Sequence, residues 1–135
     1  MEKVNIMAVV DDDDIYRFII QKTIQKKSLA DKTLMFANGL EALEFLQKKR
    51  DDNTELPDVI LLDLNMPIMD GWQFLEEYIY LKPKMGKKIT LFVVSSSVDS
   101  KDLIKASKIA EVTDFIIKPI TAEKLFNALQ NINID

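Results

Sequence analysis

The chain has 135 residues, enough for one domain with a substantial core. It contains no cysteine and no histidine, which excludes disulfides, thiolate catalysis, a serine–histidine triad and zinc sites built from these residues. A formal net charge of −4 argues against non-specific binding to nucleic acid. No apolar run reaches the roughly 20 residues that span a bilayer, and the N-terminus lacks a secretory signal, so we expect a cytoplasmic protein without membrane insertion.

Short apolar segments alternate along the chain with longer segments of helical periodicity. Rich in Val, Ile, Leu and Phe, the short segments predict strands. In chain order the sequence predicts strand Val4–Val10, helix Asp14–Lys27, strand Thr33–Ala37, helix Gly39–Lys49, strand Val59–Leu62, helix Trp72–Leu81, strand Ile89–Val94, helix Lys101–Ile109, strand Phe115–Ile117 and helix Ala122–Asn131. This alternation predicts βαβ units, hence a doubly wound parallel α/β fold of five strands and five helices. We expect one domain over 1–135, with its core at about 4–131.

Polar residues at the predicted helix starts support these boundaries. Asn38 and Glu41 have the spacing of a reciprocal capping box for the second helix. Asp99 and Asp102 have the same spacing before the fourth helix. Thr121 occupies the position of an N-cap for the last helix. Each of these residues is expected to accept a backbone hydrogen bond or to reinforce one.

Four of the predicted strands end in residues that carry chemistry. Asp11 and Asp12 follow the first strand, Asp63 the third, the serines at 95–97 the fourth and Lys118 the fifth. In a doubly wound sheet, ligands bind outside the carboxyl ends of the strands. A carboxylate cluster at that edge repels itself unless a cation or a proton neutralises it. The sequence therefore predicts a site for a hard metal ion and phosphoryl chemistry.

Four motifs occur in order: VVDD at 9–12, LLDLNMPIMDG at 61–71, VVSSS at 93–97 and FIIKP at 115–119. Together they resemble the receiver domain of two-component response regulators, of the single-domain kind found in bacterial chemotaxis. This resemblance extends over nearly the whole chain. It implies a flavodoxin-like sheet with strand order 2-1-3-4-5.

The resemblance also implies a role for each residue of the acidic group. Asp63 would be the phosphoacceptor. Asp12 would bind Mg²⁺ directly, and Asp11 mainly through metal-bound water. Asn65 would offer its backbone carbonyl to the metal ion. Residue chemistry agrees, because a carboxylate nucleophile forms an aspartyl phosphate and Mg²⁺ favours oxygen ligands from one or two carboxylates.

Three further roles follow from the resemblance. Lys118 would pair with a phosphoryl oxygen. Ser95 would be the switch hydroxyl, with Ser96 as the alternative, and Phe115 would be the rotating aromatic, with ordinary core packing as the alternative. The Lys118–Pro119 bond would be cis, although most X–Pro bonds are trans. Asp13 and Asp14 are interpreted as an N-terminal helix cap and solvated acids.

The expected function is that of a signalling module rather than an enzyme. A histidine kinase or a histidine phosphotransfer protein would donate the phosphoryl group, and the chain would catalyse only its own phosphorylation and dephosphorylation. An unidentified target protein or a further relay protein would receive the signal. One alternative is a phosphatase of the haloacid-dehalogenase type, which needs an acid two residues after its nucleophile, where this chain has Asn65. The other is a receiver-like binding module that is not phosphorylated.

Overall fold

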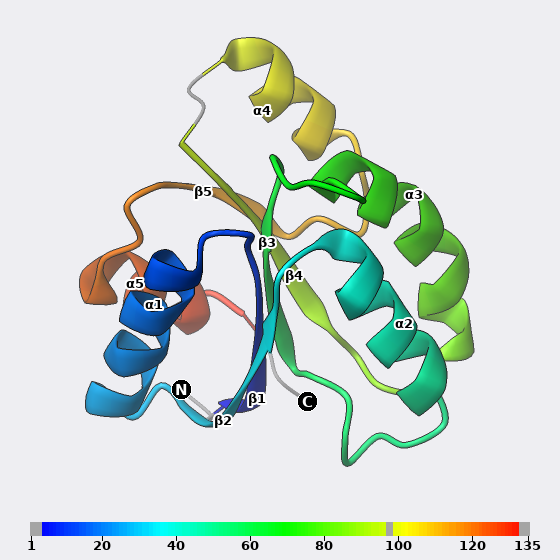
Figure 1. The fold of residues 1–135 in the computed structure, drawn as a ribbon, viewed down its shortest axis with the longest axis horizontal. Helices are drawn as coiled ribbons and strands as arrows, with labels where there is room; N and C mark the ends of the chain where they lie inside the picture. Colours follow the sequence, from blue (N-terminus) through cyan, green and yellow to red (C-terminus); the bar gives the residue numbers. More distant parts are fainter. Residues whose placement is uncertain (1–3, 97–98, 133–135) are drawn as a thin grey trace.

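Five parallel strands form one sheet in the order β2-β1-β3-β4-β5 (Figure 1). The computed structural model describes residues 4–96 and 99–132. The strands are β1 (Val4–Val10), β2 (Ala30–Phe36), β3 (Val59–Asp63), β4 (Thr90–Ser95) and β5 (Asp114–Ile117). The predicted doubly wound fold and its strand order are confirmed.

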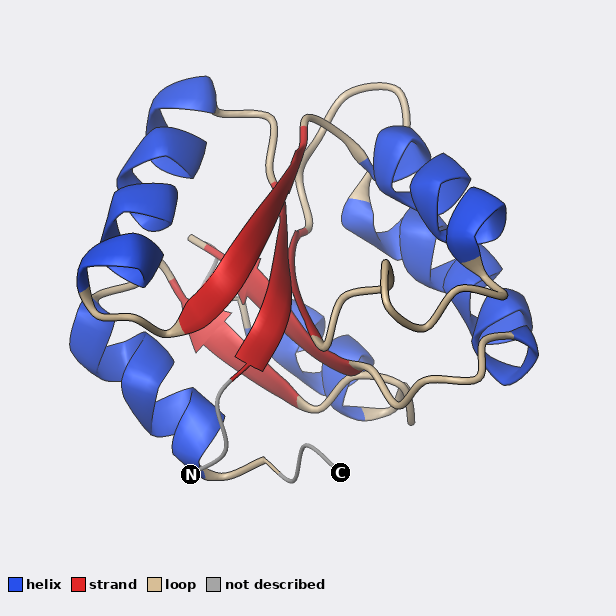
Figure 2. Cartoon of the chain, turned by 90° about the horizontal axis from the view of Figure 1, so that it is seen from below, coloured by secondary structure: helices blue, strands red, loops and turns tan. Residues whose placement is uncertain are grey.

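Helices cover both faces of this sheet (Figure 2). They are α1 (Asp14–Lys26), α2 (Gly39–Lys49), α3 (Gly71–Leu81), α4 (Ser100–Ser107) and α5 (Ala122–Gln130), with a 3₁₀ turn η1 (Lys82–Lys84) after α3. Helices α1 and α5 lie on one face and α2 and α3 on the other, as Figure 1 shows. None of the helices in the described part of the chain is long and apolar enough to cross a membrane.

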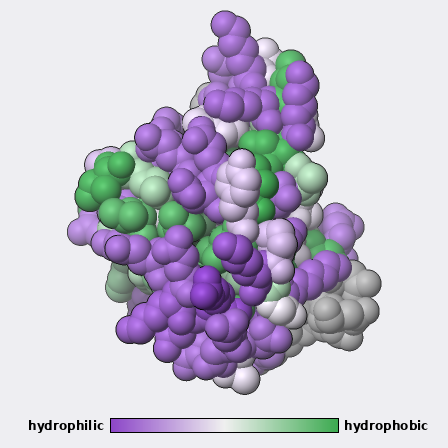
Figure 3. Space-filling model, turned by 90° about the vertical axis from the view of Figure 1, so that its right-hand side faces the viewer, coloured by the Kyte–Doolittle hydropathy of each residue, from purple (hydrophilic) through white to green (hydrophobic). Residues whose placement is uncertain are grey.

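Two apolar clusters fill the space between the sheet and the helices. On one face Met7 and Phe92 of the sheet pack with Ile20 of α1 and Leu125 of α5. On the other face strand residues pack with α2 and α3, where Phe74 and other side chains are fully buried. Alternate strand residues point to opposite faces, so the continuous apolar strands supply both clusters. Seen from the side of α2 and α3, the outer surface is mainly hydrophilic (Figure 3).

Most element boundaries match the prediction within one residue, but β2 and α4 differ more. Strand β2 begins at Ala30 instead of Thr33. The prediction missed its first residues because Asp31 and Lys32 are exposed, on a strand whose one neighbour in the described part of the chain is β1. An edge strand can carry charged residues, so its apolar pattern is incomplete. Helix α4 ends at Ser107 instead of Ile109. The backbone N–H groups of Lys108 and Ile109 donate to carbonyl oxygens three residues earlier, so the helical pattern gives way to tighter turns.

The N-caps confirm some of the expected contacts and correct others. Asn38 Oδ1 accepts from the Glu41 backbone N–H at 2.9 Å, but the Glu41 carboxylate accepts from Ala37 rather than from Asn38, so the box is not reciprocal as predicted. Thr121 caps α5 as expected. Asp99 caps α4 through the Lys101 N–H. Helix α3 carries the reciprocal box, between Asp70 and Gln73.

Strand register determines which side chains meet at the carboxyl edge. Val10 pairs with Leu62, so the chain leaves β1 beside the end of β3. Asp63 pairs with Val94, and Ser95 pairs with Ile117. The ends of β1, β3, β4 and β5 therefore lie side by side, as the sequence predicted.

Candidate functional site

Three aspartates gather where the chain leaves β1 and β3. Carboxylate oxygens of Asp11, Asp12 and Asp63 lie within 4.8 Å of one another. Asp11 and Asp63 are buried, with 2% and 5% of their surface exposed, whereas Asp12 faces solvent. An ion could thus reach the cluster from the side of Asp12. Oxygen donors of this kind suit a hard divalent cation.

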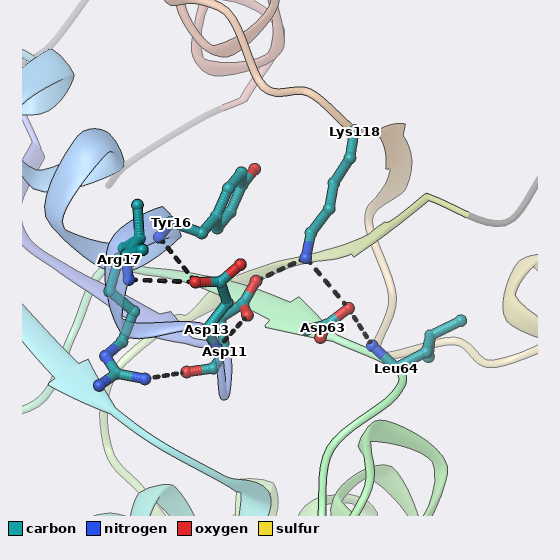
Figure 4. Close-up of polar contacts among 8 residues, drawn as sticks. Asp11, Asp13, Tyr16, Arg17, Asp63, Leu64 and Lys118 are labelled. Atoms are coloured by element: carbon teal, nitrogen blue, oxygen red, sulfur yellow. Dashed lines mark hydrogen bonds and ion pairs between the residues drawn. The ribbon is translucent and has the colours of Figure 1, made fainter.

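Lys118 brings the positive charge to this cluster from the end of β5 (Figure 4). Its Nζ lies 2.7 Å from Asp11 Oδ2, where it donates a hydrogen bond, and 3.6 Å from Asp63 Oδ1. One ammonium group faces three carboxyl groups, so the site has an excess of acidic groups. This excess favours binding of a cation or a proton.

The pKa of Asp63 responds to these surroundings. Burial and the neighbouring charge of Asp11 raise it from 3.8 to about 6, against the opposing effects of Lys118 and the Leu64 backbone N–H. That N–H donates to Asp63 Oδ1 at 3.0 Å. Burial alone would lower the pKa of Lys118, but the hydrogen bond that Lys118 donates to Asp11 and the charge of Asp63 outweigh it, so the pKa is raised. Lys118 therefore stays protonated.

The β1–α1 segment fixes the position of Asp11. The Asp13 backbone N–H donates to Asp11 Oδ1 at 3.0 Å, and the Arg17 guanidinium donates to the Asp11 carbonyl oxygen. Asp13 Oδ1 in turn accepts from the Ile15 and Tyr16 N–H groups, which confirms that Asp13 is the N-cap of α1. The Asp13 side chain thus caps the helix, while its backbone N–H supports Asp11.

The loop after β3 runs tightly against the start of α3. The Gly71 N–H donates to the Leu64 carbonyl oxygen at 3.0 Å. A side chain at Gly71 would lie 2.5 Å from the Asp63 carbonyl oxygen, so only glycine allows this approach. Asn65 is exposed in the same loop. Ile68 has a φ of 69° and is 75% exposed, a rare combination for a β-branched residue.

The remaining predicted residues flank this group. Ser95 is fully buried at the end of β4, and its carbonyl oxygen accepts from the Lys118 backbone N–H at 2.9 Å. Ser96 is exposed, and Ser97 lies outside the described residues. Phe115 is partly buried and packs against the cluster on the α2–α3 face. The Lys118–Pro119 bond is cis, as the resemblance implied.

Tyr16 was not among the residues predicted for this site. Its ring centroid lies 4.3 Å from Lys118 Nζ. Burial raises the pKa of its phenol to about 12, and the charges of Asp11 and Asp63 act in the same direction. A sequence signal existed, since Tyr16 precedes the buried Ile20 and Ile24 at intervals of four residues. That spacing predicts an inward-facing side chain, but not its contact with a lysine more than a hundred residues away.

Known proteins share both the sequence pattern and the fold. Residues 7–130 match the response regulator receiver domain family. The chain is 35% identical over 89% of its length to the sensor histidine kinase CheAY of Helicobacter pylori, although it spans only 14% of that protein. It is 34% identical to the chemotaxis protein CheY of Listeria monocytogenes, covering 92% of this chain and 94% of the relative. A two-component response regulator from Cytophaga hutchinsonii superimposes with a TM-score of 0.86 at 27% identity, covering 96% of each chain. The chain belongs to the response regulator receiver domain family.

Proposed function

We propose that this protein is a phosphorylation-switched receiver in which Asp63 accepts a phosphoryl group from a histidine kinase or a histidine phosphotransfer protein. The observation that carries the proposal is the placement of the Asp63 carboxylate: it lies at a strand end, among two further acids and within 3.6 Å of an ammonium group. We assign this role to a single receiver domain over 1–135, acting in the cytoplasm.

Phosphoryl transfer requires little covalent chemistry from the protein. An Asp63 carboxylate oxygen attacks the phosphorus atom, the bond from phosphorus to the donor nitrogen or oxygen breaks, and an aspartyl phosphate remains. With a pKa of about 6, Asp63 is mostly ionised at neutral pH and able to attack. Lys118 supplies a positive charge for the phosphoryl oxygens. The catalysis is limited to the chain's own phosphorylation and dephosphorylation.

Asp11, Asp12 and Asp63, with the Asn65 backbone carbonyl, would hold Mg²⁺. The mutual approach of the three carboxyl groups supports this assignment, and their oxygens are the donors that Mg²⁺ prefers. Bound there, the ion would offset the repulsion between the Asp63 carboxylate and an anionic phosphodonor.

Signal output would begin at residues next to the phosphorylated carboxylate. Ser95 would be the switch hydroxyl, and its complete burial at the end of β4 favours it over the exposed Ser96. Phe115, two residues before Ile117 on the neighbouring strand, would rotate as the switch proceeds. A target protein or a further relay protein would then bind the altered surface.

Labelling with acetyl phosphate tests the phosphoacceptor. We expect wild-type protein to incorporate one acid-stable, base-labile phosphoryl group when Mg²⁺ is present, and Asp63→Asn to incorporate essentially none. Asp51→Asn, which alters an aspartate with a 91% exposed side chain, is the matched control and should be labelled like the wild type. Undiminished labelling of Asp63→Asn would contradict the assignment. Continuous turnover of a simple phosphate monoester would instead favour a phosphatase.

A further inference from the structure

Lys118 has a third close contact besides its two carboxylates. The Nζ lies over the face of the Tyr16 ring, 4.3 Å from the centroid. A cation within about 6 Å of a ring centroid is attracted by the negative face of the ring. Figure 4 shows that the Lys118 ammonium, from the segment after β5, reaches the carboxylates of Asp11 and Asp63, while the Tyr16 side chain comes from α1. The lysine is thus held between a neutral ring and two acids.

Tyr16 is itself held in place by the first turn of α1. Its backbone N–H donates to the capping Asp13 carboxylate at 3.1 Å. Its side chain packs against the apolar cluster that contains Ile20 and Leu125. The phenol is neutral at physiological pH, and burial raises its pKa further, to about 12, so the ring adds no further charge to the acidic site. A ring fixed in this way provides a steady surface for the ammonium group.

The partners of Lys118 are not equivalent once a cation occupies the acidic cluster. Asp63 would be a ligand of that cation and Asp11 would bind it mainly through metal-bound water, while the shortest contact of Lys118, at 2.7 Å, is to Asp11. A metal ion and an ammonium group therefore compete for the same two carboxylate groups. The Tyr16 face has no ligand atom for the metal, so its contact with Lys118 is free of that competition.

We propose that Tyr16 is a positioning residue, whose ring face keeps the Lys118 ammonium beside Asp63 when the aspartates bind a divalent cation. This inference rests on the proposed function, in which Lys118 meets the phosphoryl oxygens. Without the ring, Lys118 would retain its charge but lose its neutral partner, and its long side chain would sample solvent more freely. Phosphorylation would slow because the positive charge is less often in place.

The contact can be measured without any phosphorylation. Ring current should shift the ε-methylene protons of Lys118 upfield in wild type, in Mg²⁺-free and Mg²⁺-saturated protein alike. The NMR signal is assigned by its loss in Lys118→Met. Tyr16→Phe should keep the shift, and Tyr16→Leu should abolish it. If Mg²⁺ abolishes the shift in wild type, or if Tyr16→Leu leaves it unchanged, the inference is wrong.

A double-mutant cycle on acetyl phosphate labelling then tests the consequence. Tyr16→Leu should lower the labelling rate by about threefold to tenfold, the range that corresponds to one cation–π contact. Tyr16→Phe should stay within about twofold of wild type. In a Lys118→Ala background, Tyr16→Leu should have no further effect. An equal loss in both backgrounds would show that Tyr16 does not act through Lys118.

Failure of Tyr16→Leu to fold, or of wild-type protein to be labelled, calls for a different experiment. If Tyr16→Leu does not fold, phenylalanines with increasing fluorination at position 16 replace it, because fluorine weakens the negative ring face with little change in shape. The labelling rate should then fall stepwise, and a constant rate would overturn the inference. If wild-type protein is not labelled at all, the proposed function fails, and the ring-current experiment alone decides whether Tyr16 holds Lys118.

Discussion

Burial and the charge of a neighbouring acid oppose the ionisation of Asp63. Its pKa of about 6 exceeds the ordinary value of 3.8 chiefly because of burial and then because of Asp11. Between these two values the native protein retains a proton that the unfolded chain has lost. The free energy of unfolding therefore falls as pH rises through this window, and the loss is complete above it. The ionised carboxylate of Asp63, the proposed phosphoacceptor, thus lowers the stability of the fold.

Removing this charge should stabilise the protein at neutral pH. In metal-free buffer at about pH 7, we expect Asp63→Asn to raise the free energy of unfolding by about 1–2 kcal/mol, because water near the site screens part of the repulsion. As pH falls from about 6 toward 4, the advantage over wild type should shrink, since wild-type Asp63 then becomes neutral as well. Urea unfolding at several pH values measures this difference. An advantage that stays constant over that range would contradict the pKa shift of Asp63.

At the scale of elements, the start of α3 packs directly on the end of β3. Gly71 is the first residue of α3, and the Asp70–Gln73 box fixes the direction of the helix at that point. A Cβ at Gly71 would be 2.5 Å from the Asp63 carbonyl oxygen and 2.8 Å from Leu64 Cα. Backbone atoms cannot yield as a flexible side chain can. The start of α3 and the segment at Asp63 and Leu64 are therefore coupled.

We expect Gly71→Ala to damage both stability and the site. The added methyl group must push β3 and α3 apart, at a cost of about 1–3 kcal/mol in the free energy of unfolding, and the labelling rate should fall with it. Gly86→Ala is the matched control, because its nearest neighbours lie 3.4 Å or more away on the Asn53 side chain. Thermal unfolding and acetyl phosphate labelling of both variants measure the two effects. Equal behaviour of the two variants would show that close packing at Gly71 is unimportant.

For the whole molecule, the topology places charges that are distant in sequence within contact distance. Asp11 and Lys118 are separated by 107 positions, yet they form a 2.7 Å ion pair. This pair and the acidic cluster exist only when β1, β3 and β5 belong to one sheet. A ligand of the cluster therefore binds the native state and not the unfolded chain, so binding and folding are linked.

Mg²⁺ should consequently stabilise the whole fold. At a concentration ten times its dissociation constant, it should raise the free energy of unfolding by about 1.4 kcal/mol. The gain should be smaller in Asp12→Asn, which removes one of the three carboxyl groups, whereas Asp51→Asn should respond like the wild type. Urea unfolding with Mg²⁺ and with Na⁺ at equal ionic strength measures this effect. An equal gain in Asp12→Asn would contradict the assignment of that residue to the metal site.

The sequence by itself determined the sheet, the alternation of helices and strands, and the set of residues at the carboxyl edge. Composition and periodicity are local properties, and parallel strands place their ends at a common edge whatever the details of packing. The beginning of β2 was not predictable, because an edge strand tolerates the exposed Asp31 and Lys32.

Only the tertiary structure decided how the residues of that edge differ in burial, pKa and contacts. Ser95 is buried while Ser96 is exposed, and the Lys118–Pro119 bond is cis. The raised pKa of Asp63 and the contact of Tyr16 with Lys118 likewise appear only in the folded chain. The physical reason is that burial, charge and ring contacts depend on distances between segments that are far apart in the sequence, and strand register and helix packing set those distances.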